Sequence, residues 1–171
     1  MKNMIFTSEY ASPLGKIVLA AQDNALTGLW FIGQKYFPKA DFFSLSAAGS
    51  GGILSDAAKW LDAYFSGECV SPKALRLAPA GSNFAKTVWD ILCEIPYGQL
   101  TTYGAIAKEL TARLGRSSMS AQAVGNAVGH NPISIIIPCH RVIGSNGSLT
   151  GYAGGLDRKR ALLRLEGQSA I

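Results

Sequence analysis

A cysteine and a histidine stand next to each other in residues 137–142, Ile-Pro-Cys-His-Arg-Val. The thiolate is the nucleophilic form of cysteine, and a free thiol with a pKa of about 8.5 is mostly protonated at neutral pH. His140 and Arg141 offer a base and a positive charge, the two kinds of group that activate a thiol. Cys139 by itself also fits a buried structural cysteine. The neighbouring His140 and Arg141 favour the interpretation of Cys139 as a nucleophile.

An apolar run over residues 135–137 precedes this cysteine, and we expect it to form a buried strand that ends there. Adjacent side chains on an extended strand point to opposite faces, so the sequence does not require direct contact between Cys139 and His140. A water molecule could carry the proton between them.

The cysteines and histidines predict a protein without a metal, and we expect no cofactor. Cys69, Cys93 and Cys139 cannot all pair within one chain because their number is odd, which favours reduced thiols. His130 and His140 are the only histidines and no Cys-x-x-Cys motif is present, so we expect no four-ligand zinc site.

The sequence has neither the apolar run of a signal peptide nor the roughly 18 apolar residues that span a bilayer. We expect a cytoplasmic protein that does not bind membranes.

The net charge of +5 is distributed unevenly along the chain. Residues 1–81 carry seven Lys or Arg and six Asp or Glu, whereas residues 82–171 carry nine and five, which gives +1 and +4. Within residues 100–165 there are eight basic side chains and two acidic ones. This asymmetry suits a polyanionic partner, and a solvated basic face is the alternative explanation.

The first half of the chain has the pattern of an α/β domain. Three apolar or β-branched runs separated by turn formers predict an antiparallel meander over 5–10, 15–22 and 26–32. Helical spacing of apolar residues predicts a helix over 53–65, with Ser55 or Asp56 near its start and Gly67 ending it. Residues 74–78 are a candidate fourth strand. We place a domain boundary at Pro79-Ala80-Gly81, between residues 1–80 and 81–171.

The second half is mainly helical. Ser82 is a candidate cap for a helix that stops before Pro96, Thr101 or Thr102 for a helix over 103–110, and Ser118 for a helix over 119–129. The last two suggest a helix-turn-helix with a long linker. A final amphipathic helix is expected over 157–166.

The helix expected over 119–129 is slender, because small residues occupy most of its surface: Ala121, Ala123, Gly125, Ala127 and Gly129. Such a surface allows another helix or a DNA strand to approach the helix backbone closely. Tight packing against a second helix and insertion into a narrow DNA groove both fit this composition.

A glycine-rich segment follows the cysteine, over residues 144–156. Asn146-Gly147 predicts a hairpin turn. Residues 151–155 contain more glycine than one turn needs, and fit a loop whose backbone lies against a flat substrate. No Gly-Lys-Ser/Thr follows, so this is not a phosphate-binding loop.

These segments together resemble the O6-alkylguanine-DNA alkyltransferases, also called methylated-DNA–protein-cysteine methyltransferases. Across residues 82–167 the following motifs fall in that family's order and spacing: Tyr103-Gly104-x-Ile106-Ala107, Ala123-Val124-Gly125, Asn131-Pro132, Pro138-Cys139-His140-Arg141-Val142 and Tyr152-Ala153-Gly154-Gly155. Residues 1–80 fit the family's variable N-terminal domain. The resemblance implies a ribonuclease H-like α/β domain followed by a mainly helical domain with a helix-turn-helix.

The implied activity is DNA repair by irreversible, single-turnover transfer of an alkyl (methyl) group from O6-alkylguanine to Cys139, with O4-alkylthymine as a second candidate substrate. His140 is implied to be the base, acting through a water, and Glu166 the carboxylate that orients it. Tyr103 is implied to protonate the departing guanine and to help rotate its phosphate, and Asn131 to brace the active-site turn. Without the motif, Tyr103 would fit a core aromatic residue.

The resemblance also implies a monomer that binds double-stranded DNA and flips the damaged nucleotide out of the helix. The residues that it assigns to DNA binding are Thr102, Ser120, Ala121, Gln122, Ala123, Ala127 and Arg141. Those that it assigns to a lid and pocket for the flipped base are Val142, Tyr152, Ala153, Gly154 and Lys159. Many family members have an arginine in place of Gln122, and glutamine lacks the charge and the planar stacking of a guanidinium.

Two other functions stay open at the level of sequence. A lesion sensor or helix-turn-helix regulator would bind DNA without covalent change, although the sensors related to this family lack the cysteine. A cysteine hydrolase based on Cys139 and His140 would turn over many substrate molecules.

Overall fold

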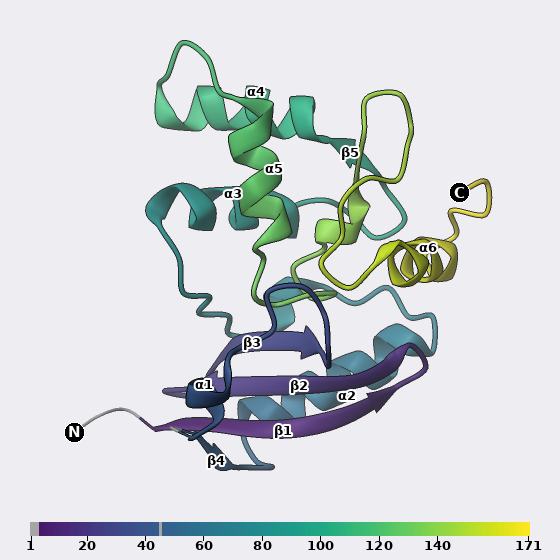
Figure 1. Ribbon diagram of the computed structural model, residues 1–171. Helices are drawn as coiled ribbons and strands as arrows, with labels where there is room; N and C mark the ends of the chain where they lie inside the picture. The colour runs from purple at the N-terminus through teal and green to yellow at the C-terminus, as the bar shows by residue number, and fades with distance from the viewer. Residues whose placement is uncertain (1–3, 45) are drawn as a thin grey trace. The chain divides into compact units, whose positions relative to one another are not determined.

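The structure is a computed structural model that describes residues 4–44 and 46–171. The chain divides into two compact units (Figure 1). The first contains the residues up to Ala80 together with Pro132–Ser134, and the second contains Gly81–Asn131 and Ile135–Ile171. Within the described residues, no helix is both long and apolar enough to cross a membrane.

A four-stranded sheet forms the base of the first unit. Its strands are β1 (Ile5–Ser12), β2 (Gly15–Gln22), β3 (Ala25–Phe31) and β4 (Ser46–Ala48), in the order β3-β2-β1-β4. The predicted antiparallel meander is confirmed, and β4 adds to β1 in parallel. β2 has strands on both sides and is buried from Ile17 to Ala21, which explains its continuous apolar run. Asp23 and Asn24 join β2 to β3 with positive φ angles of 52° and 55°, as a tight hairpin turn requires.

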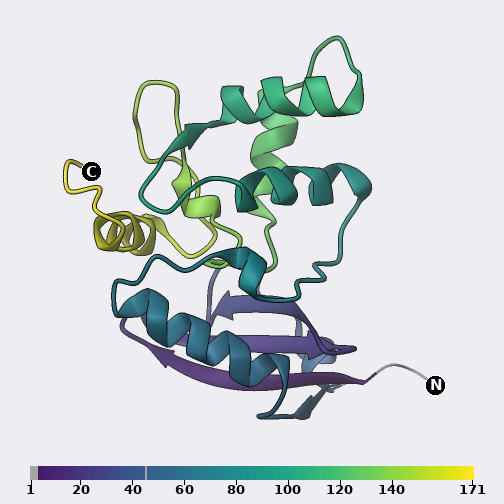
Figure 2. The same cartoon turned by 180° about the vertical axis from the view of Figure 1, so that it is seen from behind.

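One long helix, α2 (Ile53–Phe65), lies across a face of this sheet (Figure 2) and has the bounds that the sequence predicts. It buries the side chains Ile53, Leu54, Ala57, Trp60, Leu61 and Tyr64. Each fully buried aliphatic side chain stabilises the fold by about 1.5–3 kcal/mol. Gly67 ends the helix as predicted, with a φ of 92°. A short helix not expected from the sequence, α1 (Ala40–Ser44), precedes β4.

Two segments of the first unit differ from the sequence predictions. The strand expected over 74–78 is wrong: the 3₁₀ helix η1 (Pro72–Ala74) stands at its start, and only Leu77 forms a bridge, to Leu26. Pro132–Ser134, which we expected in the second domain, belongs to the first unit. The amide of Leu29 donates to the carbonyl of Pro132 at 2.9 Å, and the Ser134 amide donates to the Leu29 carbonyl at 3.1 Å. No local sequence signal predicts such a long-range pairing.

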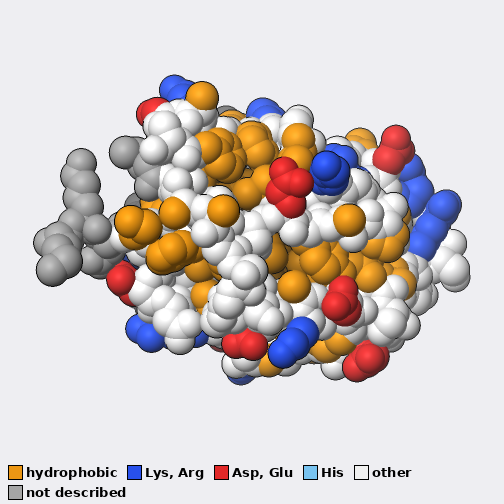
Figure 3. Space-filling model, turned by 90° about the horizontal axis from the view of Figure 1, so that it is seen from below, with side chains coloured by type: hydrophobic (Ala, Val, Ile, Leu, Met, Phe, Trp, Pro, Cys, Tyr) orange, Lys and Arg blue, Asp and Glu red, His pale blue; other side chains and the backbone are white. Residues whose placement is uncertain are grey.

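Apolar side chains are also exposed on the first unit, as Figure 3 shows for one face of the molecule. Met4 and Phe6 are among them, at 57% and 42% exposure. Both line a cleft of about 720 Å³ together with residues 21–24 and 49–54. None of the predicted site residues lines this cleft, so it plays no part in the chemistry argued below.

Four helices dominate the second unit: α3 (Asn83–Cys93), α4 (Tyr103–Leu114), α5 (Ala121–Gly129) and α6 (Leu156–Leu165). Ser82 and Thr102 cap α3 and α4 through their hydroxyl oxygens, as predicted. α5 begins later than predicted, since Ser120 and not Ser118 is its cap. Residues 115–120 join α4 to α5, which is the expected helix order with a long linker.

The helices α3, α4 and α5 pack together around a common core. It contains the buried side chains Val88, Leu92, Ile106, Leu110, Val124 and Val128. The indole of Trp89 on α3 donates a hydrogen bond to the carbonyl of Ala127 on α5, at 2.9 Å. Two short parallel strands, β5 (Thr101–Thr102) and β6 (Val142–Ile143), connect the start of α4 to the segment that follows the cysteine.

Candidate active site

Cys139 begins a 3₁₀ turn, η2 (Cys139–Arg141), and does not end a strand. The predicted buried strand over 135–137 is wrong, although its three isoleucines are buried. Ile135 has a φ of 69°, which is unfavourable for a β-branched residue and costs about 1–3 kcal/mol. This tightly turned backbone, fixed by packing on all sides, holds the cysteine in place.

Cys139 is 5% exposed, and its thiol lies beside Asn131. Burial raises the pKa of this thiol, while a hydrogen bond from Asn131 and the positive charge of Lys159 lower it. The Asn131 amide also donates to the carbonyl of Ile137 at 2.8 Å, across the turn that leads to the cysteine. Because the raised pKa favours the protonated thiol at neutral pH, a nearby base is needed to form the thiolate.

His140 and Glu166 form a buried pair in which Nε2 of the imidazole donates to Oε1 of the carboxylate at 2.6 Å. Burial lowers the pKa of His140, and the positive charges of Arg141 and Lys159 act in the same direction against the opposing effect of Glu166. The imidazole is therefore neutral at physiological pH. With the proton on Nε2, Nδ1 is the basic nitrogen that can accept a proton.

Arg141 is the second partner of this carboxylate. Its Nε donates to Glu166 Oε2 at 2.8 Å, its Nη2 to Oε1 at 3.0 Å, and its Nη1 to the carbonyl of Ile95 at 2.6 Å. Burial alone would raise the pKa of Glu166, but the hydrogen bonds and charges of His140 and Arg141 bring it down to about 2. The expected DNA contact of the Arg141 side chain is wrong, because this guanidinium is 3% exposed and bound inside the unit.

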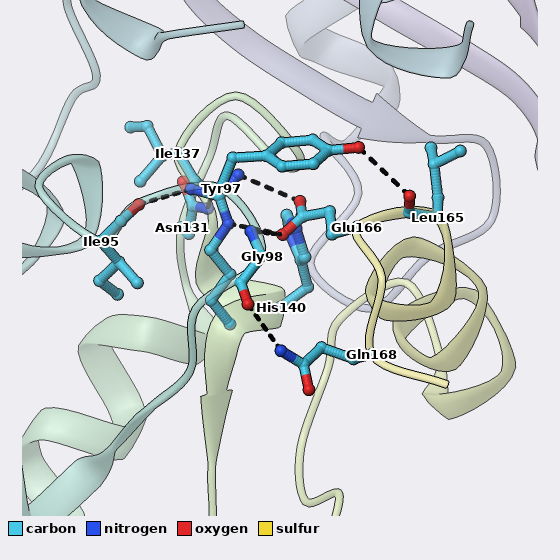
Figure 4. Close-up of polar contacts among 10 residues, drawn as sticks. Ile95, Tyr97, Gly98, Asn131, Ile137, His140, Leu165, Glu166 and Gln168 are labelled. Atoms are coloured by element: carbon cyan, nitrogen blue, oxygen red, sulfur yellow. Dashed lines mark hydrogen bonds and ion pairs between the residues drawn. The ribbon is translucent and has the colours of Figure 1, made fainter. Parts of the chain in front are cut away.

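Three further residues that the sequence did not suggest surround Glu166 (Figure 4). The amide of Gly98 donates to Glu166 Oε2 at 3.3 Å, and the carbonyl of Gly98 accepts from Gln168 at 2.6 Å. The hydroxyl of Tyr97 donates to the carbonyl of Leu165 at 3.2 Å. Gly98 has a φ of 77°, and a side chain there would meet the Glu166 carbonyl oxygen at 3.0 Å. The only sequence signal in this segment was the helix stop at Pro96, which did not reveal Glu166 as a partner of Gly98.

Tyr103 and Lys159 meet at one backbone carbonyl. The Tyr103 hydroxyl donates to the carbonyl of Thr150 at 3.0 Å, and the Lys159 ammonium donates to the same oxygen at 2.9 Å. Burial raises the pKa of Tyr103 and lowers that of Lys159 to about 8. Lys159 is fully buried, so the expectation that its side chain contacts the flipped base from a surface lid is wrong.

Comparisons with known proteins identify the family of this chain. A family model described as "6-O-methylguanine DNA methyltransferase, DNA binding domain" matches residues 83–168, and another described as "6-O-methylguanine DNA methyltransferase, ribonuclease-like domain" matches residues 5–79. The chain belongs to the 6-O-methylguanine DNA methyltransferase family. The predicted family and the predicted α/β fold with a mainly helical second half are thereby confirmed.

Individual relatives of this family are similar over nearly the whole chain. A methylated-DNA–protein-cysteine methyltransferase of Methanosarcina acetivorans is 45% identical over 159 residues, which are 92% of this chain and 96% of the relative. The crystal structure of Mycobacterium tuberculosis O6-methylguanine methyltransferase has a TM-score of 0.82 and 42% identity, and covers 98% of this chain and 95% of that one. A structure of the M. tuberculosis protein in complex with DNA has a TM-score of 0.84 at 42% identity, over 95% and 93% of the two chains.

The slender helix α5 of this family member has one exposed face. Ala121 and Gln122 are exposed and Ala123 is half-buried, whereas Ala127 is buried at 8% exposure. The expectation that Ala127 contacts DNA is wrong, because it faces the core. Asn126 is exposed four residues after Gln122, on the same helix face.

The hydroxyl oxygens of Thr102 and Ser120 accept hydrogen bonds as caps of α4 and α5. Both residues stay candidates for DNA contact, since a capping hydroxyl keeps a proton that it can donate. The helix N-termini beside them carry partial positive charge, which favours phosphate oxygens.

The residues expected to bind the base line the segment from β6 to α6. Val142 and Gly154 are buried, and Tyr152 and Ala153 are half-buried. Asn146-Gly147 forms a turn, closed by a 2.9 Å bond from the Gly144 amide to the Ser148 carbonyl. The predicted turn is confirmed, but no strand pair flanks it, because β6 pairs with β5.

Proposed function

We propose that this protein repairs O6-alkylguanine in DNA by transferring the alkyl group to Cys139, once per molecule. Membership of the family and the similarity to methylated-DNA–protein-cysteine methyltransferases support this reaction. Two buried contacts carry the assignment of residues: the thiol of Cys139 lies beside Asn131, and the imidazole of the adjacent His140 is hydrogen-bonded to Glu166. DNA is the partner, with O6-alkylguanine as the substrate and O4-alkylthymine as a second candidate.

In this proposal His140 makes the nucleophile. Its neutral imidazole accepts the thiol proton through a water, and the ionised Glu166 stabilises the imidazolium that results. The sulfur then forms a bond to the alkyl carbon as the bond from that carbon to O6 of guanine breaks. The electron pair of the broken bond leaves with guanine, which takes up a proton from Tyr103. Tyr103 regains a proton from solvent and the His140 imidazolium releases one, so that in net terms the thiol proton replaces the alkyl group on the base.

The product explains why the protein acts once. An S-alkylcysteine is a thioether, and it is not hydrolysed in the way that a thioester is. Cys139 has therefore lost its nucleophile, and nothing in the chemistry restores it. The protein is consumed in proportion to the lesions that it repairs.

The alkyl group of a stacked guanine is out of reach of a buried thiol, so the nucleotide must leave the duplex at a cost of a few kcal/mol. We assign this step to the exposed face of α5, where Gln122 would occupy the vacated space and Ala121 and Ala123 allow close approach. Val142, Tyr152, Ala153 and Gly154 would form the pocket for the flipped base. A monomeric state and a cytoplasmic location stay predictions.

The decisive experiment is incubation with a duplex that contains one O6-methylguanine, followed by intact-mass and peptide mass spectrometry. We expect a gain of one methyl group, on the peptide that contains Cys139, and a yield that stops at one equivalent. Cys139→Ala should show no gain while still binding the duplex. Binding without methylation of the wild-type protein would instead indicate a lesion sensor, and turnover beyond one equivalent would indicate a hydrolase.

A further inference from the structure

Lys159 is a charged residue in the interior of the second unit. It stands on α6 with no exposed surface, and its ammonium donates to the backbone carbonyls of Val142, Thr150 and Gly151, the last two at 2.9 and 3.4 Å. In the described part of the chain, no carboxylate forms an ion pair with it. A buried ammonium is costly unless all its protons are used, and its three donors match these three carbonyls.

The three carbonyls belong to the two ends of one loop. The loop runs from β6 to α6 (Figure 1). Val142 lies in β6, before the loop, and Thr150 and Gly151 come in the second half of the loop sequence. Since the carbonyls surround one ammonium, they fix the distance between the two ends. Val142 and residues 152–154 line the pocket that we assign to the flipped base. Lys159 therefore determines the distance between the two sides of this pocket.

The carbonyl of Thr150 has a second donor, the Tyr103 hydroxyl, at 3.0 Å. Tyr103 cannot donate one proton both to this carbonyl and to a guanine. To act as the proton donor it must release Thr150, and a carbonyl released without another donor would be left unsatisfied. Lys159 is the group that keeps this oxygen hydrogen-bonded when Tyr103 turns to the base.

We propose that Lys159 is a positioning residue for alkyl transfer, which frees the Tyr103 hydroxyl by holding the Thr150 carbonyl. It touches neither DNA nor the reacting atoms. In the free protein both donors share the carbonyl, and with the lesion bound the ammonium holds it alone. This inference rests on the proposed function, because it assigns Lys159 a part in that reaction.

The test is a set of variants assayed by single-turnover methyl transfer at saturating protein. Lys159→Met keeps the length of the side chain and removes its donors. It should lower the saturating rate constant by about tenfold, the size of effect expected when a buried acceptor loses its donor, with little change in affinity for the lesion duplex. Lys159→Gln, which retains two amide donors, should recover a large part of the rate. Lys86→Met, an exposed position on α3, is the control for loss of one charge.

A double-mutant cycle distinguishes positioning of Tyr103 from general support of the fold. Tyr103→Phe has no hydroxyl to release, so adding Lys159→Met to it should change the rate by less than about threefold, against about tenfold in the wild type. Equal effects in both backgrounds would overturn the proposal, as would a loss of duplex affinity at an unchanged rate. Failure of both Lys159 variants to fold would also overturn it, because the lysine would then serve the fold.

Amine acylation of the wild-type protein tests the burial itself. Lys159 should stay unlabelled in free protein under conditions that label Lys86 and Lys108, which are exposed. Labelling of Lys159 at the same rate would overturn the proposal. Absence of methyl transfer by the wild-type protein is a separate result: it would refute the proposed function, whatever the labelling shows.

Discussion

Arg141 and Glu166 bind each other through two hydrogen bonds, at 2.8 and 3.0 Å, and both side chains are almost fully enclosed. The same carboxylate holds His140, so one buried anion orients the base and neutralises a buried cation. Breaking a buried ion pair leaves a charge without a partner, which is far more costly than losing a surface pair.

Arg141→Met should therefore destabilise the protein by about 3–5 kcal/mol. The variant removes both guanidinium donors from the buried Glu166 carboxylate, while His140 and the Gly98 amide remain beside it. Urea unfolding followed by circular dichroism measures the change. The matched control is Arg113→Met, which removes a half-exposed arginine paired with Glu94 and Glu109 and should cost about 1 kcal/mol or less. Similar losses for both variants would contradict the buried pair.

Acid should destabilise the protein in two stages. Both His140 and Glu166 have lowered pKa values in the folded state, so the unfolded chain binds protons first and stability is lost as the pH falls. The contribution of His140 is present above its ordinary pKa of 6.5 and declines below it. That of Glu166 is present above 4.5 and is lost as the pH falls through about 2.

Urea unfolding between pH 8 and pH 2 (roughly the range that these two groups span) measures this profile. Glu166→Gln should be less stable at neutral pH and should lose less additional stability between the ordinary pKa of 4.5 and the folded value of about 2. An identical slope for the variant and the wild type over that range would show that another group controls the acid transition.

Gly98→Ala should destabilise the protein for two separate reasons. A side chain at a φ of 77° is strained, and its Cβ would lie 3.0 Å from the carbonyl oxygen of Glu166. Gly147→Ala is the matched control, because Gly147 has a φ of 80° with no atom within 4 Å of the added carbon. The control should lose about 1 kcal/mol from strain alone, and Gly98→Ala clearly more. Equal unfolding midpoints would mean that the turn moves to accommodate the side chain.

The helices and their caps could be predicted because their signals are local. Ser82 and Thr102 precede periodic apolar residues, and α2 was found at its observed bounds from spacing alone. The family motifs pointed to Cys139, His140 and Glu166, and the structure brings His140 and Glu166 into contact. The sequence prediction and the structure agree for segments whose caps and apolar spacing lie within the segment itself.

The buried cations could not be predicted in this way. An amphipathic pattern assigns a charged residue to the solvent side, yet Lys159 is enclosed by carbonyls of a loop and Arg141 by a carboxylate 25 residues away. The three isoleucines at 135–137 predict a strand, because β-branched residues rarely adopt the positive φ angle that the structure has at Ile135. Each of these features depends on partners that only the folded chain supplies.

The placement of these cations changes the electrostatic argument for DNA binding. Of the eight basic side chains in residues 100–165, Arg141 and Lys159 lie inside and Arg113 is paired with two glutamates. The second unit thus presents fewer unpaired basic side chains on its surface than the sequence count suggests. A polar side chain at the tip of α5 then has more influence on affinity than it would beside a strong basic patch.

Gln122→Arg should accordingly bind duplex DNA more tightly and with a steeper dependence on salt. Gln122 is exposed at the start of α5, where an added guanidinium can stack in the duplex and contact phosphate. Each additional phosphate contact should increase the slope of log affinity against log salt by about 0.9. Fluorescence anisotropy between 50 and 200 mM salt, about a fourfold range, measures both quantities. Lys86→Arg, an exposed substitution on α3 that keeps the charge, should change neither. If Gln122→Arg also leaves affinity and slope unchanged, α5 does not enter the duplex.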